Sequence, residues 1–154
     1  DRSSPSELFA SGKLLGRPSA GRMSMFFYDP KFKQRLPYYD EFPLVLPLEP
    51  MRGGFIGINF HYLPYGARFA FLQQLQRFSS NAKFDQSTKI QASYNSIKSN
   101  KYTKASIKRY LYSQVRSNFL RIDVNEMALA AYLPVAQFQG ATLGQVFARS
   151  RKTY

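Results

Sequence analysis

The stretch Phe42–Leu75 constrains the fold more than any other part of the chain, because no other segment is comparably apolar. It contains two strand candidates, Pro43–Leu48 and Phe55–Leu63, separated by a glycine pair that can adopt positive φ and turn the chain. Apolar residues then recur at helical spacing from Pro64 to Ser79. We therefore predict a β-hairpin at about 43–63, followed by a helix, and expect the two to supply much of the core.

The rest of the chain adds one strand candidate and several helix candidates. Met23–Tyr28 is expected to form a first strand. Apolar spacing predicts further helices over Gln86–Ser99, Thr103–Asn118 and Val124–Leu133. A last helix is predicted after Thr142, which can cap it. Asp123 and Glu126 resemble a capping box for the Ala-rich third range. The predicted fold class is α+β, with a small antiparallel sheet packed with four or five helices.

The first 22 residues differ from the rest in composition. They are rich in Ser, Gly and Pro and basic, with a short apolar patch at Leu8, Phe9, Leu14 and Leu15. Too few apolar groups are present for a core, so we predict an extended basic arm over 1–22 and a single α+β domain over 23–154. The apolar patch favours docking of the arm on a neighbouring subunit; a flexible terminus without a partner is the alternative.

Charge is the strongest signal in the composition. The 154 residues contain 22 Lys and Arg against nine Asp and Glu, which gives a net charge of +13. Such a surplus favours nucleic acid, an acidic protein surface or anionic lipid as partner. It is also compatible with a basic subunit that its neighbours in an assembly neutralise. Hydrophobic residues make up 44% of the chain, so it is not generically disordered.

Several classes of site find little support in the sequence. The chain has no Cys and a single His, His61, which lies among apolar residues and is expected to be buried or at an interface. Asp40 and Glu41 are adjacent and would point to opposite faces of a strand, and the other acids are dispersed, which disfavours a nuclease. The glycine pair lacks a phosphate-loop pattern. We therefore expect no enzyme activity, no metal, no cofactor and no small-molecule substrate, and no membrane segment, since no apolar run approaches ~20 residues.

The strongest binding candidate is the basic segment Lys98–Arg121, which lies in a region without any acid between Asp85 and Asp123. Its cations could contact phosphates and its tyrosines could stack on unpaired bases. The candidate residues for contact with nucleic acid or an acidic partner are Lys98, Lys101, Tyr102, Lys104, Lys108, Arg109, Tyr112, Arg116 and Arg121. A protein interface carries equal weight for this segment, and no reading-helix motif indicates sequence-specific binding.

Several motifs resemble a family of small proteins in T-even-like, contractile-tailed bacteriophages. They are YDPK, LPYYD and FPLV, then a GF.G.NFHYLP motif, a basic KRYL segment and an LPV..F element, which fall on Tyr28–Lys31, Leu36–Asp40, Phe42–Val45, Gly54–Pro64, Lys108–Leu111 and Leu133–Phe138. The resemblance spans about residues 23–150. It implies a virion or virion-assembly protein without enzymatic activity, in the baseplate, tail or neck, and it also allows a role on packaged DNA ends.

These observations lead to two functional hypotheses. The first is a non-enzymatic structural subunit of a tailed-phage particle, which docks on other virion proteins through its arm and its basic, aromatic-rich surface. The second is a nucleic-acid-binding protein that protects or handles phage DNA ends during packaging. Both hypotheses place the protein in the virion, after assembly in the host cytoplasm. They differ in whether DNA is a partner.

Overall fold

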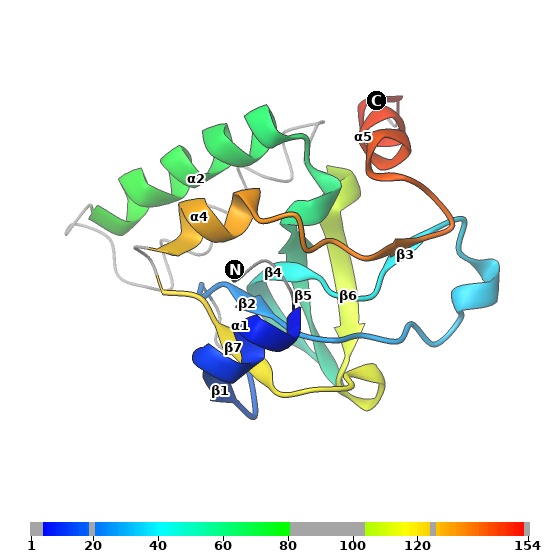
Figure 1. Ribbon diagram of the computed structural model, residues 1–154, viewed down its shortest axis with the longest axis horizontal. Helices are drawn as coiled ribbons and strands as arrows, with labels where there is room; N and C mark the ends of the chain where they lie inside the picture. The colour runs from blue at the N-terminus through cyan, green and yellow to red at the C-terminus, as the bar shows by residue number, and fades with distance from the viewer. Residues whose placement is uncertain (1–4, 19–20, 81–103, 124–125, 153–154) are drawn as a thin grey trace.

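The computed structural model describes residues 5–18, 21–80, 104–123 and 126–152, and within them it contains eight strands and four α-helices (Figure 1). The strands are β1 (Lys13–Leu15), β2 (Ser24–Met25), β3 (Tyr39–Asp40), β4 (Leu44–Met51), β5 (Gly54–Asn59), β6 (Ile107–Leu111), β7 (Phe119–Arg121) and β8 (Phe138–Gln139). The helices are α1 (Pro5–Ser11), α2 (Tyr65–Ser80), α4 (Met127–Tyr132) and α5 (Leu143–Lys152), with 3-10 turns η1 (Lys33–Arg35), η2 (Phe60–Tyr62), η3 (Lys104–Ser106) and η4 (Tyr112–Gln114). The α+β class is confirmed.

The sheet is larger than predicted. Six antiparallel strands pair in the order β1-β7-β2-β4-β5-β6, and β3 and β8 form a separate two-stranded sheet. The predicted hairpin is confirmed as β4 and β5, which run antiparallel from Val45 opposite Asn59 to Met51 opposite Gly54. The second strand is shorter than predicted, because it ends at Asn59 and residues Phe60–Tyr62 form η2. Gly53 makes the turn with φ of 75°, a backbone conformation that glycine adopts without strain.

The helix predicted over Thr103–Asn118 is wrong. This range contains η3, strand β6 and η4, and β6 pairs with β5. The apolar spacing that suggests a helix there comes from Ile107, Leu111 and Val115, but β-branched and aromatic residues also suit a strand. Gly54 allows the pairing, because a Cβ on it would lie 1.9 Å from the backbone oxygen of Tyr110. The predicted helix over 86–99 lies outside the described residues.

Both faces of the sheet are covered, which explains why β4 reads as a continuous apolar run. Leu44, Leu46 and Leu48 point to a core that includes residues of α2 and α4. Figure 1 shows these two helices lying side by side over the sheet. Val45 points to a second, aromatic cluster formed with Phe26, Tyr28, Phe55, Tyr110 and Phe119.

The aromatic cluster shows that the sheet is strongly curved. The Phe26 ring centroid lies 5.3 Å from that of Tyr110 on β6 and 4.8 Å from that of Phe119 on β7. These strands are four positions apart in the sheet, so a flat arrangement would separate them by about 19 Å. The chain after β6 also meets the chain after β2, through a bridge between Tyr28 and Val115. The strands therefore wrap around Phe26.

The N-terminal arm is not extended throughout. Residues 5–11 form α1, and β1 pairs with β7 at the edge of the sheet. Leu8 and Phe9 pack against the chain's own core, with the Phe9 ring 5.7 Å from Phe27. Leu14 remains 42% exposed, whereas Leu15 is half-buried. Docking of this segment on neighbouring subunits, and the division into an arm and a domain at residue 22, stay predictions.

The remaining helices follow the expectations with one exception. The α2 helix starts after Pro64, whose carbonyl accepts the first helical hydrogen bond from Arg68 N–H at 3.0 Å. Thr142 caps α5 in a reciprocal capping box, in which its hydroxyl accepts from Gln145 N–H and its own N–H donates to Gln145 Oε1. The predicted Asp123–Glu126 box is absent, because α4 begins only at Met127 with no side-chain cap and Asp123 instead pairs with Arg121 at 3.0 Å.

Candidate nucleic-acid interface

An aromatic pocket with a volume of about 450 Å³ opens beside β6. Three parts of the chain build it: the segment 28–40, the hairpin strands β4 and β5 with η2, and β6. Its lining residues are Tyr28, Pro30, Lys31, Phe32, Leu36, Tyr38, Tyr39, Asp40, Met51, Asn59, Tyr62, Lys108, Arg109, Tyr110 and Leu111. We call this the aromatic pocket. Its volume lies within the range of about 300–1,000 Å³ that is typical of small-molecule sites.

The rings of the pocket support one another. The ring centroid of Tyr62 lies 6.0 Å from that of Tyr38 and 5.0 Å from that of Phe138, which belongs to β8. Tyr28 and Tyr110 meet edge to face at 5.0 Å, and the Tyr28 hydroxyl accepts a hydrogen bond from Leu111 N–H at 2.9 Å. The walls are therefore held by contacts within the fold. At the mouth, Phe32 is 56% exposed and Leu36 is 43% exposed.

Basic side chains lie over these rings. The Lys108 ammonium is 4.1 Å from the Tyr62 ring centroid, and burial lowers the pKa of Lys108 to about 8. Lys31 and Arg35 lie near Phe32, at 5.5 Å and 5.4 Å from its ring centroid, and the Arg149 guanidinium lies 5.3 Å from the Tyr38 ring. Cations over aromatic faces are weakly attracted to them and remain able to bind anions.

Within the described residues, Asp40 at the pocket pairs with His61, and the other paired carboxylates contact cations outside the pocket lining. Asp29 pairs with Lys33 at 3.0 Å and with Arg116 at 3.8 Å, while Asp123 pairs with Arg121 and Lys13. No described carboxylate lies within 4.0 Å of Lys31, Lys108 or Arg109. These three cations therefore have no carboxylate partner in this part of the chain.

A buried polar network forms the floor of the pocket around Asp40, which is 4% exposed. Its Oδ1 accepts hydrogen bonds from the backbone N–H groups of Phe42 and Gln137, each at 3.0 Å. Its Oδ2 accepts from Asn59 Nδ2 at 3.0 Å and contacts His61 Nδ1 at 2.6 Å. Burial alone would raise the pKa of Asp40, but the His61 charge and these hydrogen bonds outweigh it and hold the pKa below its usual range.

The contacts of this network join separate segments of the chain. His61 is 0% exposed, which confirms its prediction as a buried histidine. A general base must come within hydrogen-bond reach of its substrate, and His61 has no access to one. The network instead fastens the segment that carries Tyr38 and Tyr39 to the hairpin and to the chain near β8. No group of three His, Cys, Asp or Glu residues in the described ranges could hold a metal ion.

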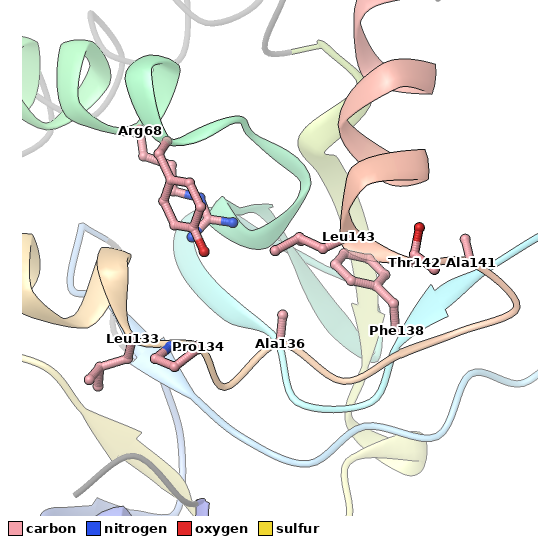
Figure 2. A pocket seen from close by; sticks show the side chains of 9 residues that line it. Arg68, Leu133, Pro134, Ala136, Phe138, Ala141, Thr142 and Leu143 are labelled. Atoms are coloured by element: carbon pink, nitrogen blue, oxygen red, sulfur yellow. The ribbon is translucent and has the colours of Figure 1, made fainter.

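Arg68 forms a second polar centre beside a smaller cavity of about 270 Å³ (Figure 2). It is 1% exposed and donates to the carbonyls of Leu63, Ala131 and His61 at 2.7, 2.6 and 3.1 Å. Burial lowers its pKa to about 10. Because these bonds reach η2 and α4 from α2, Arg68 ties the helices to the hairpin. This role depends on contacts between separate segments of the chain, so it is visible only in the structure.

The structure separates the predicted contact residues. Lys98, Lys101 and Tyr102 lie outside the described residues. Lys108 and Arg109 line the aromatic pocket, and Lys104 is exposed in η3, just before β6.

The other three predicted residues lie further along the chain and have partners. The Tyr112 ring is covered by Arg17, whose guanidinium lies 4.0 Å from the ring centroid. Arg116 and Arg121 are held by Asp29 and Asp123.

The aromatic half of the site was missed in the sequence. The stretch KFKQRLPYYDEF, residues 31–42, carries no predicted helix, strand or binding site, yet it supplies Phe32, Tyr38 and Tyr39 to the pocket. Its mixture of cations and rings was the available signal. Pairing it with β6 required the tertiary structure, because about 70 residues separate the two segments in the chain.

No helix in the described part of the chain is both long and apolar enough to cross a membrane.

Comparison with known proteins assigns the chain to a family. No curated protein and no solved structure matches the sequence. The sequence model of the family described as phage T4 terminal DNA protecting protein matches residues 9–152, which is nearly the whole chain. The chain therefore belongs to the phage T4 terminal DNA protecting protein family.

Proposed function

We propose that this protein binds the ends of phage DNA and protects them without any enzymatic activity of its own. The observation that carries the proposal is the family match over residues 9–152 to a terminal DNA protecting protein. It favours the DNA-end hypothesis over that of a structural subunit of the baseplate, tail or neck. The net charge of +13 and the cations without carboxylate partners around the aromatic pocket support it, because phosphate contacts supply much of the affinity for DNA.

Exonuclease protection tests this function directly. Linear duplex is incubated with the protein, challenged with a processive exonuclease, and compared with the same duplex without protein. We expect full-length DNA to persist in the presence of the protein. If six or more phosphates are contacted, affinity should fall by roughly 10³-fold or more between 50 and 200 mM salt. Degradation at the same rate with and without protein, under salt conditions that permit binding, would reject the proposal.

A second function, attachment to other virion proteins, is favoured by an exposed apolar surface on the helices. Phe69 is 50% exposed on α2, and Leu129 and Tyr132 are 68% and 42% exposed on α4. Apolar groups gathered on adjacent helices are typical of protein contacts. In this proposal the protein remains in the virion with the DNA end. A Leu129→Ser variant that protects DNA in solution should be depleted from purified particles; normal incorporation would argue against this surface.

A further inference from the structure

We propose that the aromatic pocket receives the unpaired nucleotide at the end of a DNA strand. The base would lie against the rings at the mouth and walls, and the phosphate would meet Lys108. This inference rests on the proposed function and adds to it a site and a ligand. It explains how the protein could distinguish an end from the interior of a duplex.

The composition of the pocket fits a nucleotide better than a purely apolar ligand. Phe32, Tyr38 and Tyr39 offer ring faces, and every base can stack on such a face. Phe32 stands at the mouth with more than half of its surface exposed, at 56%, so a base can reach it without any rearrangement of the fold. The same cavity carries Lys31, Lys108 and Arg109 for a phosphate.

Lys108 is the group best placed to hold the phosphate. Its ammonium lies over Tyr62, and no described carboxylate pairs with it. A partly desolvated ammonium gains more from an anion than an ammonium in bulk water does, because the local dielectric constant is lower. A phosphate at this position would therefore complete an interaction that the protein alone leaves open.

The carboxylate at the floor already has its partners within the fold. Each oxygen of Asp40 has two partners within the fold, so the carboxylate is occupied by Phe42, Gln137, Asn59 and His61. The same bonds hold the Tyr38–Tyr39 segment in place before any ligand arrives. A pre-formed wall avoids the entropy cost of ordering it during binding.

An end is the part of duplex DNA that such a pocket can reach. Bases inside a duplex are stacked on both sides, and extruding one costs a few kcal/mol. The last nucleotide of a strand lacks one neighbour, and in a single-stranded tail it lacks its pairing partner as well. A pocket of one-nucleotide size therefore selects ends, whereas basic surface alone would bind any stretch of duplex.

The test compares two DNA molecules that differ only in their ends. One is a duplex with short single-stranded tails; the other has the same duplex closed by a hairpin loop at each end. The full chain is titrated with each in the same salt. The variants are Phe32→Ala and Lys108→Met, with Phe69→Ala and Lys13→Met as matched controls. Phe69 is an equally exposed ring on α2, and Lys13 is an exposed lysine on β1, at the opposite edge of the sheet from β6.

We expect Phe32→Ala to weaken binding of the tailed duplex by about ten-fold, the typical loss of one base–aromatic stack, and to leave the closed duplex unchanged. Lys108→Met should act in the same direction, and both controls should behave as the original protein. Phe32 is exposed, so its removal should not unfold the chain; thermal melting of each variant verifies this. In addition, 5-iodo-deoxyuridine at the terminal position should photo-crosslink to the pocket rings, whereas the same base at an internal position should not.

The outcomes separate this inference from the proposed function. If the original protein prefers tailed over closed duplex but Phe32→Ala and Lys108→Met keep that preference, with the crosslink mapping elsewhere, the pocket inference is overturned and end binding stands. The pocket would then be assigned to a protein partner. If the original protein binds both duplexes equally, the pocket inference fails for lack of any end selectivity. Absent binding to both duplexes would overturn the proposed function as well.

Discussion

At the scale of single residues, buried polar groups do most to define the site. Asp40 and Arg68 are each almost fully enclosed and hydrogen-bonded to segments far apart in the chain. Asp40 accepts from Gln137, and Arg68 donates to Ala131, so each residue connects the first half of the chain to the last third. Breaking such a network costs more than a surface ion pair, because the groups left behind stay buried without partners.

Replacing Asp40 with Asn should destabilise the protein by about 3 kcal/mol or more, since the variant leaves the buried His61 without its carboxylate. Urea unfolding at pH 7 measures this. Asp29→Asn is the control, because its pair with Lys33 is exposed and screened by solvent and should contribute little. Equal effects of the two substitutions would show that the network contributes little.

Asp40 also predicts a pH dependence of stability. Its pKa in the folded state lies below the unfolded value of about 3.9, so its contribution is fully present above that value. It is then lost as the pH falls toward the lower folded pKa. We expect the free energy of unfolding to decline below about pH 4. The Asp40→Asn variant should show a shallower decline, and parallel profiles for the two proteins would contradict this assignment.

Lys108 predicts a pH dependence of DNA binding in the alkaline range. Because burial brings its pKa to about 8, the side chain loses its charge as the pH rises above that value. Affinity for a tailed duplex should therefore fall between pH 7 and pH 9. A Lys108→Arg variant, which stays charged throughout, should keep its affinity over the same range. Identical pH profiles would show that the Lys108 ammonium does not contact DNA.

At the scale of elements, the strand β6 carries the site, and glycine controls how closely it pairs. Gly54 leaves no room for a Cβ, which would lie 1.9 Å from the Tyr110 carbonyl oxygen. A Cβ on Gly57 would likewise lie 2.5 Å from a Val45 methyl group on the neighbouring strand β4. The hairpin glycines therefore serve strand packing, in addition to the turn at Gly53.

Gly54→Ala should destabilise the protein by about 3 kcal/mol, because backbone atoms of β6 would have to move to admit a methyl group. Gly66→Ala is the matched control in α2, where a Cβ meets nothing within 4 Å, and it should stabilise by up to about 1 kcal/mol. Thermal unfolding of both variants checks the pair. A mild effect at Gly54 would mean that β6 does not lie against β5.

At the scale of the whole molecule, the N-terminal segment belongs to the fold of the same chain. The Phe9 ring packs at 5.7 Å from Phe27 and 5.9 Å from Phe42, and β1 extends the sheet beyond β7. Contact with a neighbouring subunit would then involve what this segment leaves exposed, such as Leu14.

Phe9→Ala should lower the stability of the isolated protein by about 2 kcal/mol, part of the ~3–5 kcal/mol that a fully buried Phe contributes. Leu14→Ala, at a position 42% exposed, should change it by less than about 0.5 kcal/mol. Chemical unfolding of each variant measures the difference. An unchanged stability of Phe9→Ala would show that the segment docks elsewhere, as an extended arm would.

The sequence by itself determined the local features. The glycine pair specified the hairpin, the period of the apolar residues specified α2, and Thr142 with Gln145 specified the start of α5, since all three depend on residues close together in the chain. The charge surplus and the lone apolar histidine were likewise readable, and they pointed to a polyanionic partner and a buried His61.

Only the tertiary structure decided what depends on distant segments. The Ile107–Leu111 segment fits either a helix or a strand by its own spacing, and pairing with β5 made it a strand. From the sequence, Leu8 and Phe9 were available for a neighbouring subunit, whereas in the structure they pack against the core of the same chain. The aromatic pocket joins residues 28–40 to β6, and no pattern within either segment reveals the other. Local propensity is a property of neighbouring residues, whereas pairing, burial and a cavity are set by the free energy of the whole fold.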